Sequence, residues 1–256
     1  MRIIFSRKGF DSAAGGGASP IVDGRPVSLP IPAGTASTTN YGALGLGEHA
    51  AVASRGKLGA DDLCHHDPMF RTWGRGGVAG QGEAECLFGQ CGAAQTHLER
   101  QGVGRGDVFV FFGLFREDRA DGSRGEPHHR IFGYLEVEQI IPLADGAPDE
   151  LIQLGHPHAL AMHHKNDVIY RGPGRTANHA SDQLRLTVPE GPPSMWHRPA
   201  WLKRGGLSYH DKPVRWQQRG RLQSVARGQE FVADIGKRQA PRDWLAGIIA
   251  AINRSP

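Results

Sequence analysis

The sequence has few cysteines and no long apolar run, and each scarcity excludes a class of protein. Its three cysteines, Cys64, Cys86 and Cys91, are an odd number without CxxC spacing, which argues against a disulfide framework and a thiolate zinc site. No run approaches the roughly 18 apolar residues of a membrane-spanning helix, so we expect no membrane partner. The N-terminal apolar segment is too short for a secretory signal. We therefore expect a cytoplasmic protein.

Glycine and proline, by contrast, are abundant, with 36 and 17 residues among 256. This content favours strands and loops and argues against an all-helical bundle. Hydrophobic residues make up 39% of the chain, which is enough to form a core and excludes wholesale disorder. No repeat is visible, and no low-complexity linker divides the chain. We expect a single domain over residues 1–256.

The apolar pattern predicts an α+β fold, with a curved mixed sheet or a small β-barrel and a few short helices. The clearest signals are two long strands at 108–115 and 130–141, which we expect to be neighbours. Gly113 and Gly133 permit bends in them. Further strands are predicted at 2–6, 167–170, 183–188 and 230–235, and helices at 44–53, 91–101 and 241–253.

Positive charge is concentrated in the C-terminal third. Residues 198–238 hold ten Lys or Arg against three acidic residues, although the whole chain has a net charge of only +4. Aromatic side chains alternate with these cations, as in Arg215-Trp216, and stacking on unpaired bases beside phosphates requires this combination. Arg227 and Gln229 could read a base edge. The alternatives are that the tryptophans belong to the core and that arginine is frequent because the genome is GC-rich.

Eight of the thirteen histidines gather in short groups, at 65–66, 128–129, 156–158 and 163–164. Imidazole with carboxylate suits proton transfer and binding of a divalent transition metal, but no HExxH motif is present. Asp67 precedes a proline, which keeps it extended, so His66 and Asp67 could form a base and its orienting carboxylate. An Asx turn explains Asp67 equally well.

A second polar segment, residues 88–97, begins a predicted helix. Gln90, Gln95 and His97 lie there, where amide groups could meet a base edge or a phosphate. Helix starts in other globular proteins look similar. Cys91 is a formal candidate nucleophile, but no neighbour in sequence would lower its pKa.

Several motifs together resemble the bacterial and phage family called nucleotide modification associated domain 3. They are FSRKGFDS at 5–12, SLPIP at 28–32, CHHDP at 64–68, FGQCGAAQ at 88–95 with HLE at 97–99, GDVFVFFG at 106–113, IFGYL at 131–135 and RGQEFV at 227–232. The resemblance spans residues 2–250 and implies a role in modifying nucleotides or DNA bases. DNA or a nucleotide is then the expected partner, with other base-modification enzymes as further candidates.

Under this resemblance, the acid, base or metal group would comprise Asp11, His66, Asp67 and His97. Arg7, Lys8, Gln90, Gln95, Arg215, Trp216, Arg227 and Gln229 would hold the phosphate or base. No particular cofactor is implied; a divalent transition metal is the candidate. This hypothesis requires the segments that carry these residues to converge on one cavity.

A looser resemblance links residues 100–145 to PUA-like barrels, including the EVE, ASCH and YTH groups. It rests on Gly106-Asp107, the apolar strand that follows, and the second strand at 131–137. Those folds hold a flipped or modified base, which implies a second candidate function, a reader of modified bases without catalysis. Because histidine is so frequent, a third candidate function remains, that of a metal-dependent enzyme acting on a small molecule or peptide.

Overall fold

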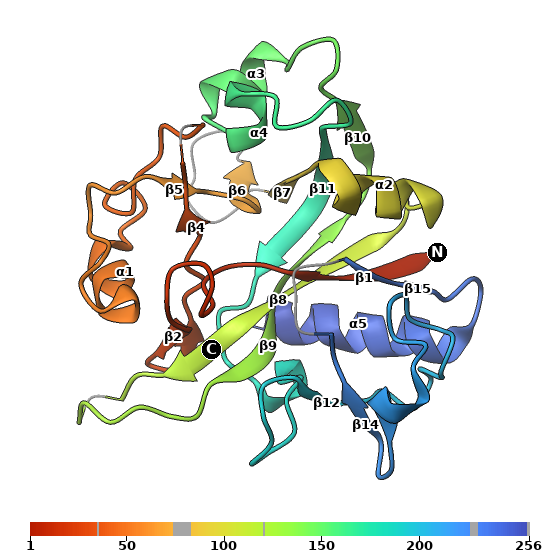
Figure 1. Ribbon diagram of the computed structural model, residues 1–256. Coiled ribbons are helices and arrows are strands. Elements are labelled where there is room, and N and C mark those ends of the chain that lie inside the picture. The colour runs from red at the N-terminus through yellow and green to blue at the C-terminus, as the bar shows by residue number, and fades with distance from the viewer. Residues whose placement is uncertain (35, 74–82, 120, 226–229, 255–256) are drawn as a thin grey trace.

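The computed structural model describes residues 1–254 except 35, 74–82, 120 and 226–229 (Figure 1). The strands are β1 (Arg2–Arg7), β2 (Ser19–Val22), β3 (Arg25–Pro26), β4 (Ile31–Pro32), β5 (Cys64–His65), β6 (Met69–Trp73), β7 (Glu83–Gln90), β8 (Val108–Glu117), β9 (His128–Glu136), β10 (Gln139–Pro142), β11 (Val168–Thr176), β12 (Met195–His197), β13 (Trp216–Gln217), β14 (Arg221–Gln223) and β15 (Phe231–Asp234). The helices are α1 (Gly47–Ser54), α2 (Gly92–Arg100), α3 (Asp149–Gln153), α4 (Pro157–Leu160) and α5 (Gln239–Asn253). Within these described segments, every helix is too short or too polar to cross a membrane.

A ten-stranded mixed sheet organises the molecule. Its main path runs β15-β1-β8-β9-β11-β7-β6, with β10 beside β11 and the β2–β3 pair beside β8. The pairs β1–β8 and β2–β8 are parallel and the others antiparallel. The predicted α+β class with a curved mixed sheet is thus confirmed, and the described strands leave the sheet open rather than closing it into a barrel.

The central strands are buried on both faces of the sheet. Successive side chains of a strand point to opposite faces, and each face is covered by an apolar cluster. In β8, Val108 and Val110 join the cluster that contains the α5 residues Leu245 and Ile248. Phe109 lies in the cluster on the other face, with Leu98 of α2. Figure 1 shows α5 on one side of β8 and α2 on the other. Each such side chain contributes about 1.5–3 kcal/mol through burial.

Strand β11 joins the two halves of the sheet by changing partners along its length. Its first part pairs with β7 and β10, and its end pairs with β9. A side chain at Gly172 would overlap the carbonyl of Glu136, and one at Gly174 would meet the carbonyl of Tyr134 at 2.5 Å. The Gly-Pro-Gly sequence at 172–174 therefore lets the two halves approach closely.

Most elements with a strong local pattern lie where the sequence predicted them. Strands β1, β8, β11 and β15 and helices α1, α2 and α5 are confirmed, and β8 and β9 are neighbours. Two predictions are wrong. The run 130–141 ends as β9 at Glu136, and β10 then pairs with β11 instead. Segment 183–188 begins as a 3₁₀ turn, Asp182–Leu184, because Ser181 caps it by accepting the N–H of Gln183.

His129 makes stability depend on pH. Burial, reinforced by the charges of Arg7 and His128, lowers the pKa of His129 from 6.5 to about 3, and its Nδ1 accepts the indole N–H of Trp196 at 3.0 Å. The unfolded chain binds this proton below pH 6.5 while the folded chain does not. The stabilisation that comes from keeping His129 neutral is therefore fully present above pH 6.5. It is lost as the pH falls, by up to about 1.4 kcal/mol of unfolding free energy per pH unit.

We expect His129→Gln to reduce the loss of unfolding free energy between about pH 7 and about pH 5 by roughly 1–2 kcal/mol. Denaturant titrations at the two pH values measure this difference. His197→Gln is the matched control, because His197 is exposed, and it should lose as much unfolding free energy as wild type between the two pH values. An equal loss in wild type and His129→Gln would contradict a role of His129 in the pH dependence.

Candidate active site

Two hollows adjoin at the end of β1. The larger, about 540 Å³, has mainly apolar walls, and the smaller, about 330 Å³, is lined by imidazoles, charged groups and amides. Lys8, Gly9 and Asp67 line both. The remaining larger walls are Arg25, Pro26, Val27, Ser28, Pro30, Leu44, Gly45, Leu46, His49, His66, Pro68, Phe70, Phe132 and Thr176. Those of the smaller are Arg7, Asp11, Ala14, Ile31, His65, Gly89, Gln90, Cys91, His158 and His163.

Three neighbouring strands place the polar groups of the smaller hollow together. Met69 of β6 pairs with Leu87 of β7, and continuing this register by two residues brings Asp67 opposite Gly89. On the other side of β7, Val168 of β11 pairs with Gln90. Asp167 therefore lies at the same end of the sheet as Asp67, with the end of β7 between them.

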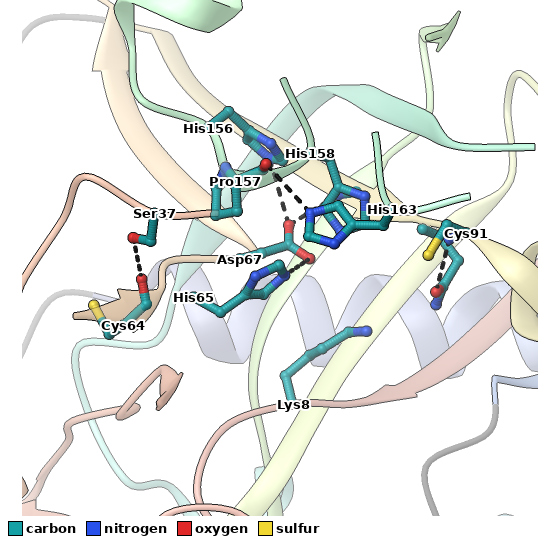
Figure 2. A network of polar contacts seen from close by, with 12 residues as sticks. Lys8, Ser37, Cys64, His65, Asp67, Cys91, His156, Pro157, His158 and His163 are labelled. Carbon is teal, nitrogen blue, oxygen red and sulfur yellow. Dashed lines mark hydrogen bonds and ion pairs between the residues drawn. The ribbon is translucent and has the colours of Figure 1, made fainter. Parts of the chain in front are cut away.

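Asp67 is the centre of the cluster, and its side chain is only 4% exposed. Its Oδ1 accepts the N–H of Gly89 at 2.9 Å and lies 3.5 Å from Nε2 of His156, while Oδ2 lies 3.9 Å from Nε2 of His65. Burial alone would raise the pKa of Asp67, but His156, followed by His158 and His65, outweighs it and lowers this pKa well below its ordinary value. Figure 2 shows the carboxylate with the imidazoles gathered around it.

His158 is held in one orientation by a second buried carboxylate. Its Nδ1 lies 2.5 Å from Oδ1 of Asp167, whose Oδ2 accepts the backbone N–H of His163 at 2.9 Å. Since Asp167 occupies Nδ1, the Nε2 of His158 is the ring nitrogen left to accept a proton or bind an ion. The His158 ring lies 4.5 Å from that of His163 and 5.3 Å from that of His65, measured between centroids.

Two glycines leave the space that this arrangement needs. A side chain at Gly89 would overlap the His158 ring, so only glycine lets the imidazole lie over the end of β7. A side chain at Gly113 would meet the carbonyl of Lys8 at 2.7 Å. The N–H of Lys8 donates to Phe112 at 2.8 Å, and Gly113 thus allows the chain beyond β1 to approach β8.

Lys8, which lines both hollows, belongs to a buried polar network. Its ammonium lies 3.2 Å from Oε1 of Glu230, which also accepts the side-chain N–H of Gln90 at 2.7 Å. The ammonium also lies 4.2 Å from the centroid of the Phe88 ring, at cation–π distance. The network holds a cation beside the histidine cluster.

Burial shifts the pKa of both His65 and Cys91. Burial lowers the pKa of His65 to about 4 even though Asp67 opposes the shift, so His65 is neutral near pH 7. Burial also raises the pKa of Cys91, and the charges of Asp167 and Asp67 add to the effect. Cys91 therefore remains a thiol, which argues against a role as nucleophile.

Among the residues that the structure describes, two groups of side chains have the composition and spacing to hold a metal ion. The donor atoms of His65, Asp67 and His158 lie within 4.8 Å of one another, and so do those of Cys91, His158 and Asp167. Imidazole and carboxylate together suit iron, zinc or manganese. His158 belongs to both groups.

The structure brings half of the predicted site residues to the two hollows. Lys8 and Asp67 line both, His66 lines the larger, and Arg7, Asp11 and Gln90 line the smaller. Arg7 and Asp11 form an ion pair at 3.1 Å, and Oδ1 of Asp11 also accepts the backbone N–H groups of Ala13 and Ala14.

Four of the predicted residues lie elsewhere. Gln95 is buried and accepts the hydroxyl of Tyr170 at 2.9 Å. His97 contacts Ser208 at 3.1 Å and packs against Tyr209. Arg215 donates to the carbonyls of Gln223 and Ser224, and Trp216 donates to that of His210. Arg227 and Gln229 fall outside the described residues.

Sequence reasoning selected His66 and missed His65, although the two are adjacent. Side chains of consecutive extended residues face opposite ways, and it is His65 that faces the other histidines. The histidine groups at 156–158 and 163–164 were a usable signal for His158. Asp167 carried none, because its partnership with His158 depends on the turn between α4 and β11.

We expect Gly89→Ala to destabilise the protein by about 1–3 kcal/mol, because the added methyl displaces the His158 ring. Chemical denaturation measures the change. Gly34→Ala is the control, since nothing lies within 4 Å of the added carbon there, and it should change stability by less than about 0.5 kcal/mol. Equal effects of the two substitutions would show that His158 does not pack on Gly89 as described.

Comparison with known proteins places this site in a family context. A family model described as nucleotide modification associated domain 3 matches residues 2–234. The search of curated proteins finds no match, and the search of solved structures finds none either. The matched span includes both hollows and the whole His/Asp cluster. The chain therefore belongs to the nucleotide modification associated domain 3 family and has a general role in nucleotide modification.

Proposed function

We propose that this protein is an enzyme that binds a nucleotide, free or within DNA, across the two adjoining hollows and modifies its base. The observation that carries the proposal is that a His/Asp cluster suited to chemistry and a larger hollow suited to binding share Lys8, Gly9 and Asp67. Ligand pockets usually combine an apolar cavity of roughly 300–1,000 Å³ with a few convergent polar groups.

The larger hollow has the walls that a base requires. Phe70 and Phe132 line it, together with leucine and proline side chains, and flat apolar or aromatic surfaces stabilise a base outside its stack. Ser28, His66 and Thr176 also line it and provide hydrogen-bonding groups for a base edge. These walls support a base as the bound group.

Charge supports a phosphate at the same site. Lys8 and Arg25 both line the larger hollow, and cations of this kind bind phosphate oxygens through charge-assisted hydrogen bonds. Exposed Lys203, Arg204, Arg219 and Arg221 add positive charge elsewhere on the surface, which favours DNA over a free nucleotide as the substrate.

The smaller hollow supplies the groups for a reaction. A buried carboxylate among imidazoles can accept or deliver a proton or hold a metal ion. A reader of modified bases needs stacking and edge contacts but no such cluster. The polar chemistry buried at the end of β7 therefore favours modification over reading.

The test has a binding arm and a product arm. We expect purified protein to bind deoxynucleotides or short DNA, measured by calorimetry, and DNA from expressing cells to contain a nucleoside of altered mass, measured by mass spectrometry. Cells expressing Asp67→Asn should lack this nucleoside. Absence of nucleotide and DNA binding would contradict the proposal, while binding without any product would favour the reader.

We expect Lys8→Gln to weaken nucleotide binding about 10- to 100-fold, because it removes a charge-assisted contact to phosphate. Calorimetric titration of each variant with a deoxynucleoside monophosphate measures the change. Lys237→Gln is the control, since Lys237 is exposed at the turn after β15, and it should bind as wild type does.

Because Lys8 also pairs with the buried Glu230, thermal unfolding must confirm that Lys8→Gln is folded. Lys8→Arg retains a cation and should recover part of the affinity if charge is the cause. Unchanged binding by folded Lys8→Gln would remove Lys8 from the phosphate site.

A further inference from the structure

We propose that His65, Asp67 and His158, which line the smaller hollow, bind one divalent first-row transition-metal ion there. The ligand atoms would be Nε2 of His65, Oδ2 of Asp67 and Nε2 of His158. The role of the ion in catalysis rests on the proposed function, whereas its binding can be measured without it.

The three donors are almost at ligand spacing. One donor atom of each residue lies within 4.8 Å of a donor atom of the other two, and His65 Nε2 is 3.9 Å from Asp67 Oδ2. Ligands at about 2.0–2.2 Å from one ion are separated by roughly 3–4 Å. Side-chain adjustments of about 1 Å or less therefore bring all three donors onto a single ion.

The surroundings of His158 are those of a metal ligand. A histidine that binds a metal through one nitrogen usually donates its other N–H to a carboxylate, which fixes the tautomer and the ring orientation. Asp167 does this for His158, because it is buried and lies 2.5 Å from Nδ1. Asp167 is thus a positioning residue for His158.

His156 provides a further observation. It is fully buried, and neither of its ring nitrogens has a hydrogen bond among the described residues. Its contact with Asp67 is an ion pair in which Nε2 lies 3.5 Å from Oδ1. A buried ring nitrogen without a hydrogen bond is costly, and water bound to an ion next to Asp67 would supply that bond.

The alternative group, Cys91, His158 and Asp167, is less suitable. Asp167 already accepts from His158 and from the backbone N–H of His163, and binding an ion would disrupt both contacts. Cys91 would also have to lose a proton from a thiol whose pKa is raised by burial and by the two carboxylates. The first group needs neither change.

The ligand set points to a catalytic ion rather than a structural one. Structural zinc sites are closed by four protein ligands, whereas catalytic sites keep a position open for water or substrate. Two imidazoles and one carboxylate leave such positions, and the adjoining space of about 330 Å³ holds them. This combination suits Zn²⁺, Fe²⁺ or Mn²⁺.

The test uses the full chain and the metal alone. Protein stripped with a chelator is dialysed against Zn²⁺ or Co²⁺ and analysed by elemental mass spectrometry and by visible absorption of bound Co²⁺. We expect about one equivalent per chain and a rise in melting temperature. Asp67→Asn and His65→Ala should each weaken binding at least about 100-fold, and Asp167→Asn about 10- to 100-fold.

His197→Ala is the matched control, because this histidine is exposed on β12, and it should bind like wild type. If Asp67→Asn does not fold, His65→Ala decides, since the His65 side chain is 21% exposed and tolerates truncation better. Folded wild type that binds no metal, or variants that bind as tightly as wild type, would overturn the proposal.

The two proposals fail separately. Nucleotide modification that continues in chelator-treated, metal-free protein would overturn the catalytic role of the ion and leave the proposed function standing. One equivalent of metal bound at these residues, in a protein that binds neither nucleotide nor DNA, would support the site and contradict the proposed function.

Discussion

The buried carboxylate of Asp67 is the constraint on which the site depends. Removing an ionised carboxylate from water costs several kcal/mol unless hydrogen bonds and opposite charges replace the lost solvent. Here one backbone N–H, from Gly89, and the imidazoles of His65, His156 and His158 do so. The requirement extends outward, because Gly89 must lack a side chain for His158 to lie beside Asp67, and Asp167 must orient His158. A change at any of these positions therefore affects a charge, not only a packing contact.

The sheet order explains how segments so distant in sequence meet. Strand β7 lies between β6 and β11, so Asp67 and Asp167 reach the same end of the sheet although 100 positions separate them. Strand β1 runs between β8 and β15, which brings Lys8 to Glu230, just before β15. The family match over 2–234 includes all of these strands. The site is thus a product of the whole sheet rather than of one local motif.

Sequence reasoning succeeded where the signal was local. The continuous apolar run of 108–115 and the amphipathic pattern of 241–253 identify their elements without tertiary information. It failed where a residue distant in sequence determines the role of a side chain. The amide of Gln95 suits a contact to a ligand, yet its oxygen accepts a hydrogen bond from the hydroxyl of Tyr170, 75 positions later. Asp67 could be found because the proline after it fixes an extended backbone, whereas Asp167 could not, since nothing near it in sequence shows that it faces His158.

The distribution of charge fixes how a nucleotide would lie in the proposed complex. Lys8 and Asp67 line both hollows, Arg25 lines only the larger one, and Asp11, paired with Arg7, lines only the smaller one. A phosphate beside Asp67 and Asp11 would suffer like-charge repulsion in a partly desolvated space, where such interactions are stronger than in water. Beside Arg25 and Lys8 it meets two cations. In the proposed complex the phosphate would therefore lie at the Arg25 end, and the base edge would face His65, Asp67 and His158. This orientation is the one that base modification requires.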